Sequence, residues 1–478
     1  MNYRMIAHTL GWILLFEAAF LLVPLITAIV FGESAVLAFL WAMSACLSAS
    51  ALLLLVRPKN SDLRARDGFV IVSLSWIVMS IFGAFPFMLS GSIPSFVDAL
   101  FETVSGFTTT GSSILTDVEA LPKSMLMWRA FTHWVGGMGV LVFLMAFLPL
   151  SGGRNMHIMK AESPGPSVSK LVPRVRTTAL LLYGIYFVLT LIQFILLLCG
   201  GMTAYEALST SFATAGTGGF GFYNSSMGSF SPYLQIVIAV FMLLFSLNFA
   251  SYFLLLQKKW REAFSSEIRG FLAVVAVAVT AITINILPLY NSVADAMRDA
   301  LFTVSSIIST TGFSTVNFDL WPQFSRLLLI LLMFIGACAG STGGGIKISR
   351  FIILFKGVRR ELSKTIHPKL TKKISMDGKS VEEETVSSVF TFFFCYMAIF
   401  TVSMILISLD TADFTTNFTA VSATIGNIGP GLAAVGPTRN FAFFSPFSKL
   451  VLIFDMLAGR LELLPMLLLF SPSTFKNN

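Results

Sequence analysis

The sequence predicts an all-α integral membrane protein in which four parallel repeats surround one pore and a two-helix hairpin precedes them. Three observations support this prediction. Of the 478 residues, 55% are hydrophobic and only 12% are charged, which is far more apolar than one soluble core requires. Several apolar runs are long enough to be membrane helices, and a short segment that ends in glycine recurs four times.

The apolar runs are each close to the roughly 20 residues that a helix needs to cross a bilayer. They cover about residues 10–31, 35–56, 68–90, 125–150, 177–200, 232–256, 271–289, 324–339, 386–409 and 446–470. The first two runs form the hairpin, and the others pair into four units. We therefore expect a hairpin at 1–67 and repeats at 68–176, 177–270, 271–385 and 386–478.

The glycine-ended segment lies between the two spans of each unit and is too short to cross a bilayer. It is predicted to be a half-helix that enters the membrane and returns as a loop. The fourth copy is the weakest in sequence. The same spacing separates the first residue from the final glycine in Ala99 to Gly111, Ala207 to Gly219, Ala300 to Gly312 and Asn417 to Gly429.

Lys and Arg residues predict the orientation, because cytoplasmic loops carry an excess of them. One side holds Arg4, Lys476 and the basic segments 57–66, 154–176, 258–269 and 347–379. This side is predicted to be cytoplasmic and to hold the N-terminus, and all half-helices then enter from outside. The repeats are thus parallel, unlike the inverted repeats of many secondary transporters. The opposite side holds only Lys123, Arg129, Arg298, Arg326, Arg439 and Lys449, and Arg460 lies within a span.

Four such loops on one axis would present rings of carbonyl oxygens. Such rings can replace the hydration shell of a monovalent cation. Gly111, Gly219, Gly312 and Gly429 suit this role, because glycine adopts the positive φ that turns successive carbonyls to one side. The alternative is that small residues here only permit close helix packing.

Acidic residues precede three of the half-helices, namely Asp98, Glu206 and Asp299. One interpretation is that these carboxylates cap the helix N-termini and complement the helix dipole. The other is that they attract cations to the outer mouth.

A glycine-rich stretch from Gly336 to Gly345 interrupts the second span of the third repeat, and Lys347 follows it. So many glycines cannot continue an ordinary helix. We interpret this stretch as a mobile gate on the cytoplasmic side of the loops, with a passive bend as the alternative. The predicted gate consists of Gly340, Ser341, Thr342, Gly343, Gly344, Gly345, Lys347 and Arg460.

Arg460 lies about midway along the last span, where a charge usually faces the bundle interior or a cavity. We expect it to face the pore and to bond carbonyls of the Gly340–Gly345 loop. The alternative is a buried ion pair with Asp455 or Glu462.

Several other functions lack the residues that they need. Cys46, Cys199, Cys338 and Cys395 lie far apart in apolar surroundings, so we expect free thiols and no metal cluster. Neither common nucleotide-binding glycine motif occurs. The four histidines are dispersed, which argues against an enzyme, and His133 is interpreted as a packing residue. The net charge of +8 is explained by membrane orientation, so no nucleic acid is expected.

These motifs together resemble the superfamily of K+ transporters that includes bacterial Trk and Ktr and plant HKT. The resemblance covers about residues 68–470, and the two additional N-terminal spans favour the Trk branch over Ktr. The second loop departs most, because Gly216-Thr217-Gly218-Gly219 is richer in glycine than the usual pattern. The motifs that carry the resemblance are Thr108-Thr109-Thr110-Gly111, Ser309-Thr310-Thr311-Gly312, Gly426-Asn427-Ile428-Gly429, Ser341-Thr342-Gly343-Gly344-Gly345 and Gly459-Arg460.

The resemblance implies uptake of K+, and of Rb+, across the bacterial inner membrane by a homodimer in the lipid bilayer. It also implies a cytosolic TrkA-like regulatory ring that binds NAD(H) or adenine nucleotides, with no organic cofactor in this chain. The glycine-rich loop and Arg460 match the family's gate and pore arginine. The implied K+ selectivity filter consists of Thr109, Thr110, Gly111, Gly218, Gly219, Thr310, Thr311, Gly312, Asn427, Ile428 and Gly429.

The sequence thus predicts a gated K+ pathway and no covalent chemistry. The alternative is a Na+- or H+-coupled secondary transporter of another solute, which would need intramembrane carboxylates near the midplane and inverted repeats. Glu17 is the clearest deep carboxylate, and it lies outside the repeats.

Overall fold

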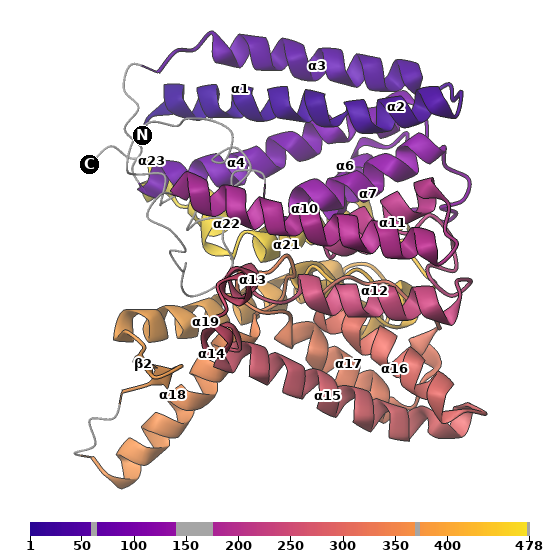
Figure 1. The fold of residues 1–478 in the computed structure, drawn as a ribbon. Coiled ribbons are helices and arrows are strands. Elements are labelled where there is room, and N and C mark those ends of the chain that lie inside the picture. The colour runs from indigo at the N-terminus through magenta and orange to yellow at the C-terminus, as the bar shows by residue number, and fades with distance from the viewer. Residues whose placement is uncertain (59–64, 140–174, 369–372, 476–478) are drawn as a thin grey trace.

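The computed structural model describes residues 1–58, 65–139, 175–368 and 373–475, which are almost entirely helical (Figure 1). The predicted 125–150 span beyond residue 139, and most of the basic segment at 154–176, lie outside the described residues. The two short strands, β1 (Ser375–Met376) and β2 (Lys379–Ser380), pair antiparallel in a hairpin after α18 (Ile348–Ile366).

The N-terminal hairpin consists of α1 (Tyr3–Phe20), continued by α2 (Leu22–Val30), and α3 (Val36–Leu54). The two arms lie side by side because Gly11 brings the backbones close: a Cβ there would lie only 3.0 Å from the Leu54 side chain. The buried Ser50 hydroxyl donates to the Gly11 carbonyl at 2.7 Å. Small residues at a close helix crossing are typical of membrane helix packing.

Four units follow the hairpin, each with an outer helix, a half-helix and a second helix, as the sequence predicts. The outer helices are α4 (Ala65–Gly83) with α5 (Phe85–Leu89), α10 (Val175–Cys199), α15 (Ser266–Ile286) and α19 (Glu383–Ile407). The half-helices are α6 (Phe96–Phe107), α11 (Ala204–Ala215), α16 (Val293–Ile308) and α20 (Phe414–Ile425). The second helices are α7 (Lys123–Gly137), α12 (Pro232–Phe245) with α13 (Phe249–Leu256), α17 (Gln323–Ile335), and α21 (Pro446–Arg460) with α22 (Leu464–Leu469). Short elements complete the described residues: α14 (Trp260–Ala263), α23 (Pro472–Phe475) and the 3-10 turns η1 (Leu287–Leu289), η2 (Phe318–Leu320) and η3 (Ala433–Val435).

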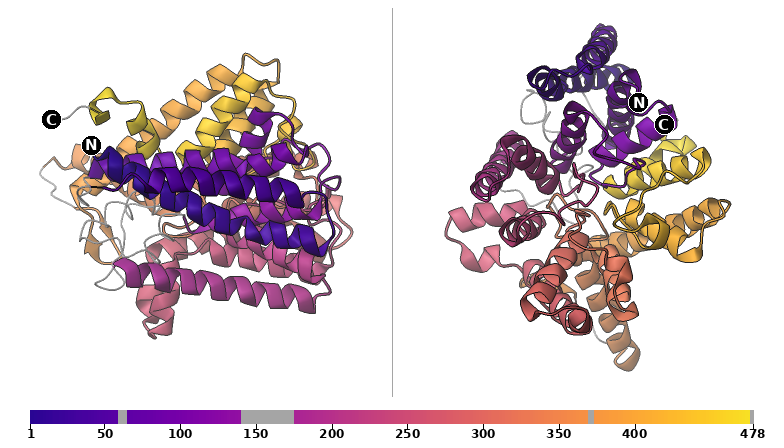
Figure 2. Two further views of the ribbon diagram at one scale, coloured as in Figure 1. Left: turned by 90° about the horizontal axis from the view of Figure 1, so that it is seen from above. Right: turned by 90° about the vertical axis from the view of Figure 1, so that its right-hand side faces the viewer.

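The units are arranged around a common centre, which is clear when the molecule is viewed along its long axis (Figure 2, right). The outer helices α10, α15 and α19 are only 22–28% buried over their most apolar windows, so their apolar side chains are left for lipid. The corresponding helix of the first unit is 61% buried, because the N-terminal hairpin packs against α4. The hairpin therefore covers one unit and leaves the other three facing the bilayer.

Each half-helix begins at a side chain that caps its free backbone N–H groups. Ser95, Thr203, Ser292 and Asp413 accept bonds from the first turns of α6, α11, α16 and α20. The prediction that Asp299 caps the third half-helix is wrong, because α16 begins six residues earlier, at Val293. Asp299 instead accepts bonds from Tyr290 and Thr315.

The second helices differ most from the prediction of continuous spans. Among the described residues, six helices are long and apolar enough to cross a membrane, or seven if the α12–α13 pair counts as one span. That pair bends by 91° at residues 246–248, and α21 ends before a break at 461–463. The predicted spans at 232–256, 324–339 and 446–470 are therefore all broken. An interruption was predicted for the third repeat alone, and the second and fourth repeats have one as well. The break between α12 and α13 contacts the loop between α17 and α18, which is described below.

Both termini and α18 lie at one end of the bundle (Figure 1). From there α18 projects away from the helices around the axis.

Candidate functional site

The four pore loops, residues 108–111, 216–219, 309–312 and 426–429, share one backbone conformation. Each has positive φ at two residues, with one residue between them. The first is Thr109, Thr217, Thr310 or Asn427, with φ of 53–61°, and the second is the final glycine, with φ of 77–104°. A non-glycine residue in this region costs on the order of 1–3 kcal/mol and persists only where its surroundings enforce it. Four repetitions of this strain indicate a functional conformation.

The pore loops form a closed ring, in which each final glycine lies against a carbonyl of the next loop. A Cβ added at Gly111, Gly219 or Gly312 would overlap that carbonyl oxygen, and at Gly429 it would lie 3.0 Å away. The order of contacts is the order of the repeats, and the fourth returns to the first. Gly111 faces Gly218, Gly219 faces Thr311, Gly312 faces Ile428 and Gly429 faces Thr110.

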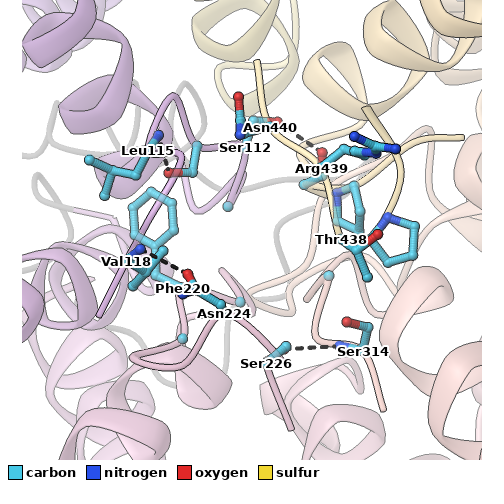
Figure 3. A pocket seen from close by; sticks show the side chains of 18 of the residues that line it. Ser112, Leu115, Val118, Phe220, Asn224, Ser226, Ser314, Thr438, Arg439 and Asn440 are labelled. Carbon is cyan, nitrogen blue, oxygen red and sulfur yellow. Dashed lines mark hydrogen bonds between the residues drawn. The ribbon is translucent and has the colours of Figure 1, made fainter. Parts of the chain in front are cut away.

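A pocket lies over one end of this ring, and all four final glycines line it (Figure 3). The rim is polar and comes from all four units. Ser112, Asn224, Ser314 and Asn440 are among its lining residues. The ring therefore opens to the surface on the side from which the half-helices enter.

Buried polar side chains bind the segment that directly follows the first pore loop. Glu102 on α6 accepts a bond from Arg129 on α7 at 2.7 Å and another from the Ile114 backbone at 3.0 Å. Arg129, which the sequence places on the outer side of the membrane, is only 2% exposed and therefore lies inside the protein. The guanidinium is paired inside the protein and also donates to the Gly221 carbonyl at 3.1 Å.

His133 connects the first two pore loops and is not the simple packing residue that the sequence suggests. Its Nδ1 donates to the Gly106 carbonyl at 2.8 Å, and its Nε2 accepts from the Phe220 backbone at 3.2 Å. These two partners fix the tautomer. The imidazole ring also lies against Gly218, where a Cβ would overlap it, and the His133 backbone carbonyl lies against Gly216 in the same way. The unusual glycine content of the second loop therefore makes room for His133.

Asn427 plays a similar part in the fourth loop. Its amide donates to Thr110 Oγ1 and to the Met456 carbonyl, both at 2.9 Å, so that it joins two pore loops and α21.

The α17–α18 loop, residues 336–347, lies at the end of the ring away from the pocket, which is called the inner end below. Gly344 N–H donates to Thr310 Oγ1 at 2.7 Å, and Lys347 Nζ donates to the Gly343 carbonyl. All of the predicted gate residues in this loop are buried except Gly340 and Gly345, which are half-buried. The loop therefore fills the space directly beneath the pore loops.

The bend between α12 and α13 receives the α17–α18 loop. Because the helix stops at Phe245, the carbonyls of Phe245 and Ser246 are free of intrahelical partners. Cys338 N–H donates to Ser246 at 3.1 Å, and the Thr342 hydroxyl donates to Phe245 at 3.1 Å. In return, the Gly340 carbonyl accepts from Phe249, the first residue of α13, at 3.0 Å. The broken second helix of one unit thus binds the broken second helix of the next.

Arg460 joins three units at this level. It donates to the Thr342 carbonyl at 2.7 Å, and to the carbonyls of Gly136 and Gly137 at the end of α7 at 2.6 and 2.7 Å. The expected contact with the α17–α18 loop is therefore present. Of the two carboxylates proposed as alternative partners, Glu462 pairs with Arg350, and Asp455 accepts from Ser403 at 2.7 Å.

Glu267, at the start of α15, anchors the two arms of the α17–α18 loop. Its carboxylate accepts from Ala339 N–H at 2.6 Å and from Ser349 N–H, in the first turn of α18, at 3.3 Å. A buried carboxylate at a helix N-terminus complements the helix dipole. A role for Glu267 was not predicted, although an acid directly before an apolar span is a visible signal in the sequence.

The fold and this site define a pore-loop membrane protein, in which four re-entrant loops surround one axis. A family model described as a cation transport protein, TrkH, matches residues 34–478. The chain therefore belongs to the TrkH family of cation transport proteins, which confirms the predicted resemblance, the fold class and the prediction of a transporter rather than an enzyme.

Individual relatives match over the whole chain. The Trk system potassium uptake protein TrkH of Salmonella typhimurium is 36% identical, with both chains covered completely. The TrkG protein of Escherichia coli is 32% identical over 98% of both chains. The crystal structure of the potassium transporter TrkH from Vibrio parahaemolyticus superposes with a TM-score of 0.90 at 33% identity, again over all of both chains.

Proposed function

We propose that the chain takes up K+, and Rb+, across a bacterial inner membrane through the ring of pore loops. The observation that carries this proposal is the closed ring of glycine-to-carbonyl contacts among the four loops. A ring of main-chain oxygens at the end of four half-helices can replace the hydration shell of a monovalent cation. Each half-helix also directs its partly negative C-terminus toward the same centre.

The α17–α18 loop is proposed as the gate of this pathway. Support comes from its position beneath the ring and from its dependence on contacts from other units, chiefly those of Arg460. Movement of a segment about its hinge residues, or its change between order and disorder, is a common basis of switching in proteins. Lys347, within the same loop, adds a positive charge close to the path.

Two partners are proposed for the cytoplasmic side, namely a second copy of the chain and a TrkA-like ring that binds NAD(H) or adenine nucleotides. The curated relatives are named as parts of a Trk system, which supports a multi-component assembly. Four apolar side chains on one side of α18 are 53–74% exposed, as expected of a helix with a protein partner. These are Phe355, Val358, Leu362 and Ile366.

The function is tested by uptake of 86Rb+ into liposomes that contain the purified protein, with and without a Na+ or proton gradient. The expected result is uptake that unlabelled K+ suppresses and Na+ does not. Equal suppression by K+ and Na+ would contradict a selective K+ pathway.

Coupling to a second ion is the remaining alternative. Two carboxyl groups, Glu17 and Asp455, are fully buried, and both Glu17 oxygens have no hydrogen-bond partner among the described residues. Glu17 lies on α1, outside the four units, whereas Asp455 lies on α21 and contacts α19 through Ser403. Rb+ uptake that accelerates with an imposed proton gradient, and loses this response in Asp455→Asn, would favour the coupled transporter.

A further inference from the structure

The α17–α18 loop is in backbone contact with the third and fourth pore loops. A Cβ added to Gly343 would lie 2.8 Å from the Ser309 carbonyl oxygen, and one added to Gly344 would overlap the Gly426 carbonyl oxygen. No methyl group fits at either position. The loop therefore occupies the inner end of the ring so closely that its position and that of the pore loops depend on each other.

Thr310 makes the direct hydrogen bond across this contact. Its hydroxyl, fully buried, accepts from Gly344 N–H at 2.7 Å. The residues at the same place in the other pore loops bond differently. The Thr217 hydroxyl donates to its own neighbour Gly216, the Asn427 amide donates to Thr110 and Met456, and Thr109 Oγ1 has no hydrogen-bond partner among the described residues.

The energetic consequence of this bond is one-sided. If the Thr310 hydroxyl is removed while the loop stays in place, the Gly344 N–H is left buried without an acceptor. An unpaired buried donor is more costly than an exposed one, because it has lost its hydrogen bonds to water without gaining a bond within the protein. Movement of the loop away from the ring relieves this cost, so removal of the hydroxyl favours the displaced loop.

We propose that Thr310 is a positioning residue that holds the α17–α18 loop in its closed place and couples it to the third pore loop. This inference rests on the proposed function, because it assigns Thr310 a part in closing the same pathway. When the loop leaves, the hydroxyl loses its N–H partner and becomes available to the path. Closure of the gate and the polar lining at the inner end of the ring are then linked.

Cys338 offers a measurement of loop position that does not require conduction. It lies within the α17–α18 loop and is fully buried, so a maleimide reaches it only when the loop moves. The parent protein for the test carries Cys46→Ala, Cys199→Ala and Cys395→Ala, which leaves Cys338 as the single thiol. The rate of maleimide labelling in liposomes then reports how often the loop is displaced.

Thr310→Val is the central variant, because valine keeps the β-branched shape, and hence the backbone strain at φ 61°, and replaces only the hydroxyl with a methyl group. We expect Cys338 to be labelled roughly tenfold faster than in the parent. A tenfold change corresponds to about 1.4 kcal/mol, and the cost of an unpaired buried N–H group is of this size. Thr310→Ser, which keeps the hydroxyl, is expected to stay within about twofold of the parent. Thr401→Val is the matched control, since it removes a hydroxyl on the exposed side of α19 and should leave labelling unchanged.

Thr310→Ala is a second variant without the hydroxyl, and gel filtration identifies any variant that does not fold. Parent-like labelling in the folded Val or Ala variant overturns the inference. 86Rb+ uptake is measured on the same samples, so that the two proposals fail separately. Thr310-dependent labelling without Rb+ uptake would reject the proposed function and retain the coupling, whereas Rb+ uptake with Thr310-independent labelling would do the reverse.

Discussion

Glycine is required to different degrees around the ring of pore loops. At Gly111 the positive φ of 80° and the adjacent Gly218 carbonyl both exclude a side chain, whereas at Gly429 the nearest carbonyl leaves a Cβ 3.0 Å away. Glycine is therefore required at Gly111 both by the backbone conformation and by the adjacent carbonyl. At Gly429 it is required mainly by the backbone conformation.

We predict that Gly111→Ser lowers the ratio of 86Rb+ to 22Na+ uptake about tenfold or more, since a factor of ten needs only about 1.4 kcal/mol. The serine side chain must push the Gly218 carbonyl out of the ring. Gly429→Ala is the graded comparison and should lower the ratio less. Equal loss in the two variants would show that steric overlap in the ring does not set selectivity.

Arg460 acts through geometry as well as charge, because one planar guanidinium reaches carbonyls of two different units. We predict that Arg460→Ala raises 86Rb+ leak in the absence of any regulatory protein by roughly tenfold, as three charge-assisted bonds are lost. Arg460→Lys should restore only part of the closure, because an ammonium cannot reproduce the fork. Leak at the parent level in Arg460→Ala would remove this residue from the gate.

The residues that the sequence could reveal were those with a distinctive type at a repeated spacing. The final glycines and Arg460 were recognised for this reason, and the structure brings them to the same central region. Positive φ at Thr109 was not predictable, because nothing in a threonine marks it as strained. His133 was missed because its two backbone partners are 27 and 87 residues away in sequence.

At the scale of helices, the half-helices and outer helices were predictable and the second helices were not. Residues 232–256 are together apolar enough for one span, although the chain turns by 91° at residues 246–248. The local signal was Asn248, which caps α13 by accepting from Ala250 N–H at 2.9 Å. Pro465 near the start of α22 was a comparable signal for the break after α21. Freed carbonyls at such breaks find their partners in other units, which no single-helix pattern contains.

Glu267 allows the joint between α15 and the α17–α18 loop to be tested. We predict that Glu267→Ala speeds labelling of Cys338, in the single-thiol parent described above, by roughly tenfold, since the Ala339 and Ser349 N–H groups lose their acceptor. Glu267→Gln keeps an oxygen acceptor without the charge, so its labelling rate should lie between those of the parent and of Glu267→Ala. Glu262→Ala, at an exposed position on α14, is the control. Slow labelling in Glu267→Ala would mean that Arg460 and Thr310 suffice to hold the loop.

For the whole molecule, the sequence predicted a hairpin followed by four parallel units but not how the hairpin is attached. The attachment depends on contacts between residues far apart in the sequence, and none of the segments has a sequence pattern that predicts these contacts. The Lys123 ammonium lies 4.1 Å from the centre of the Phe31 ring, and Tyr205 of the second unit donates to the Lys123 carbonyl at 2.9 Å. The hairpin, the first unit and the second unit thus meet at one point.

Glu33, in the turn between α2 and α3, is the centre of this attachment. Helix α7 begins after Pro122, which has no capping side chain, and the Glu33 carboxylate accepts from the backbone of Lys123 at 2.7 Å and of Ser124 at 3.1 Å. A residue of the hairpin therefore caps a helix of the first unit. Loss of an N-cap typically costs about 0.5–2 kcal/mol.

We predict that Glu33→Ala lowers the midpoint of thermal unfolding in detergent by a few degrees and leaves the Rb+/Na+ uptake ratio unchanged. Glu33→Gln, which keeps one of the two acceptor oxygens, should recover only part of the loss, because the two backbone N–H groups bind different oxygens of the carboxylate. Glu384→Ala, an exposed acid at the other end of the molecule, should shift the midpoint less. A changed uptake ratio in Glu33→Ala would mean that the hairpin does more than stabilise α7, and that its docking helps to set the shape of the first pore loop through α7 and His133.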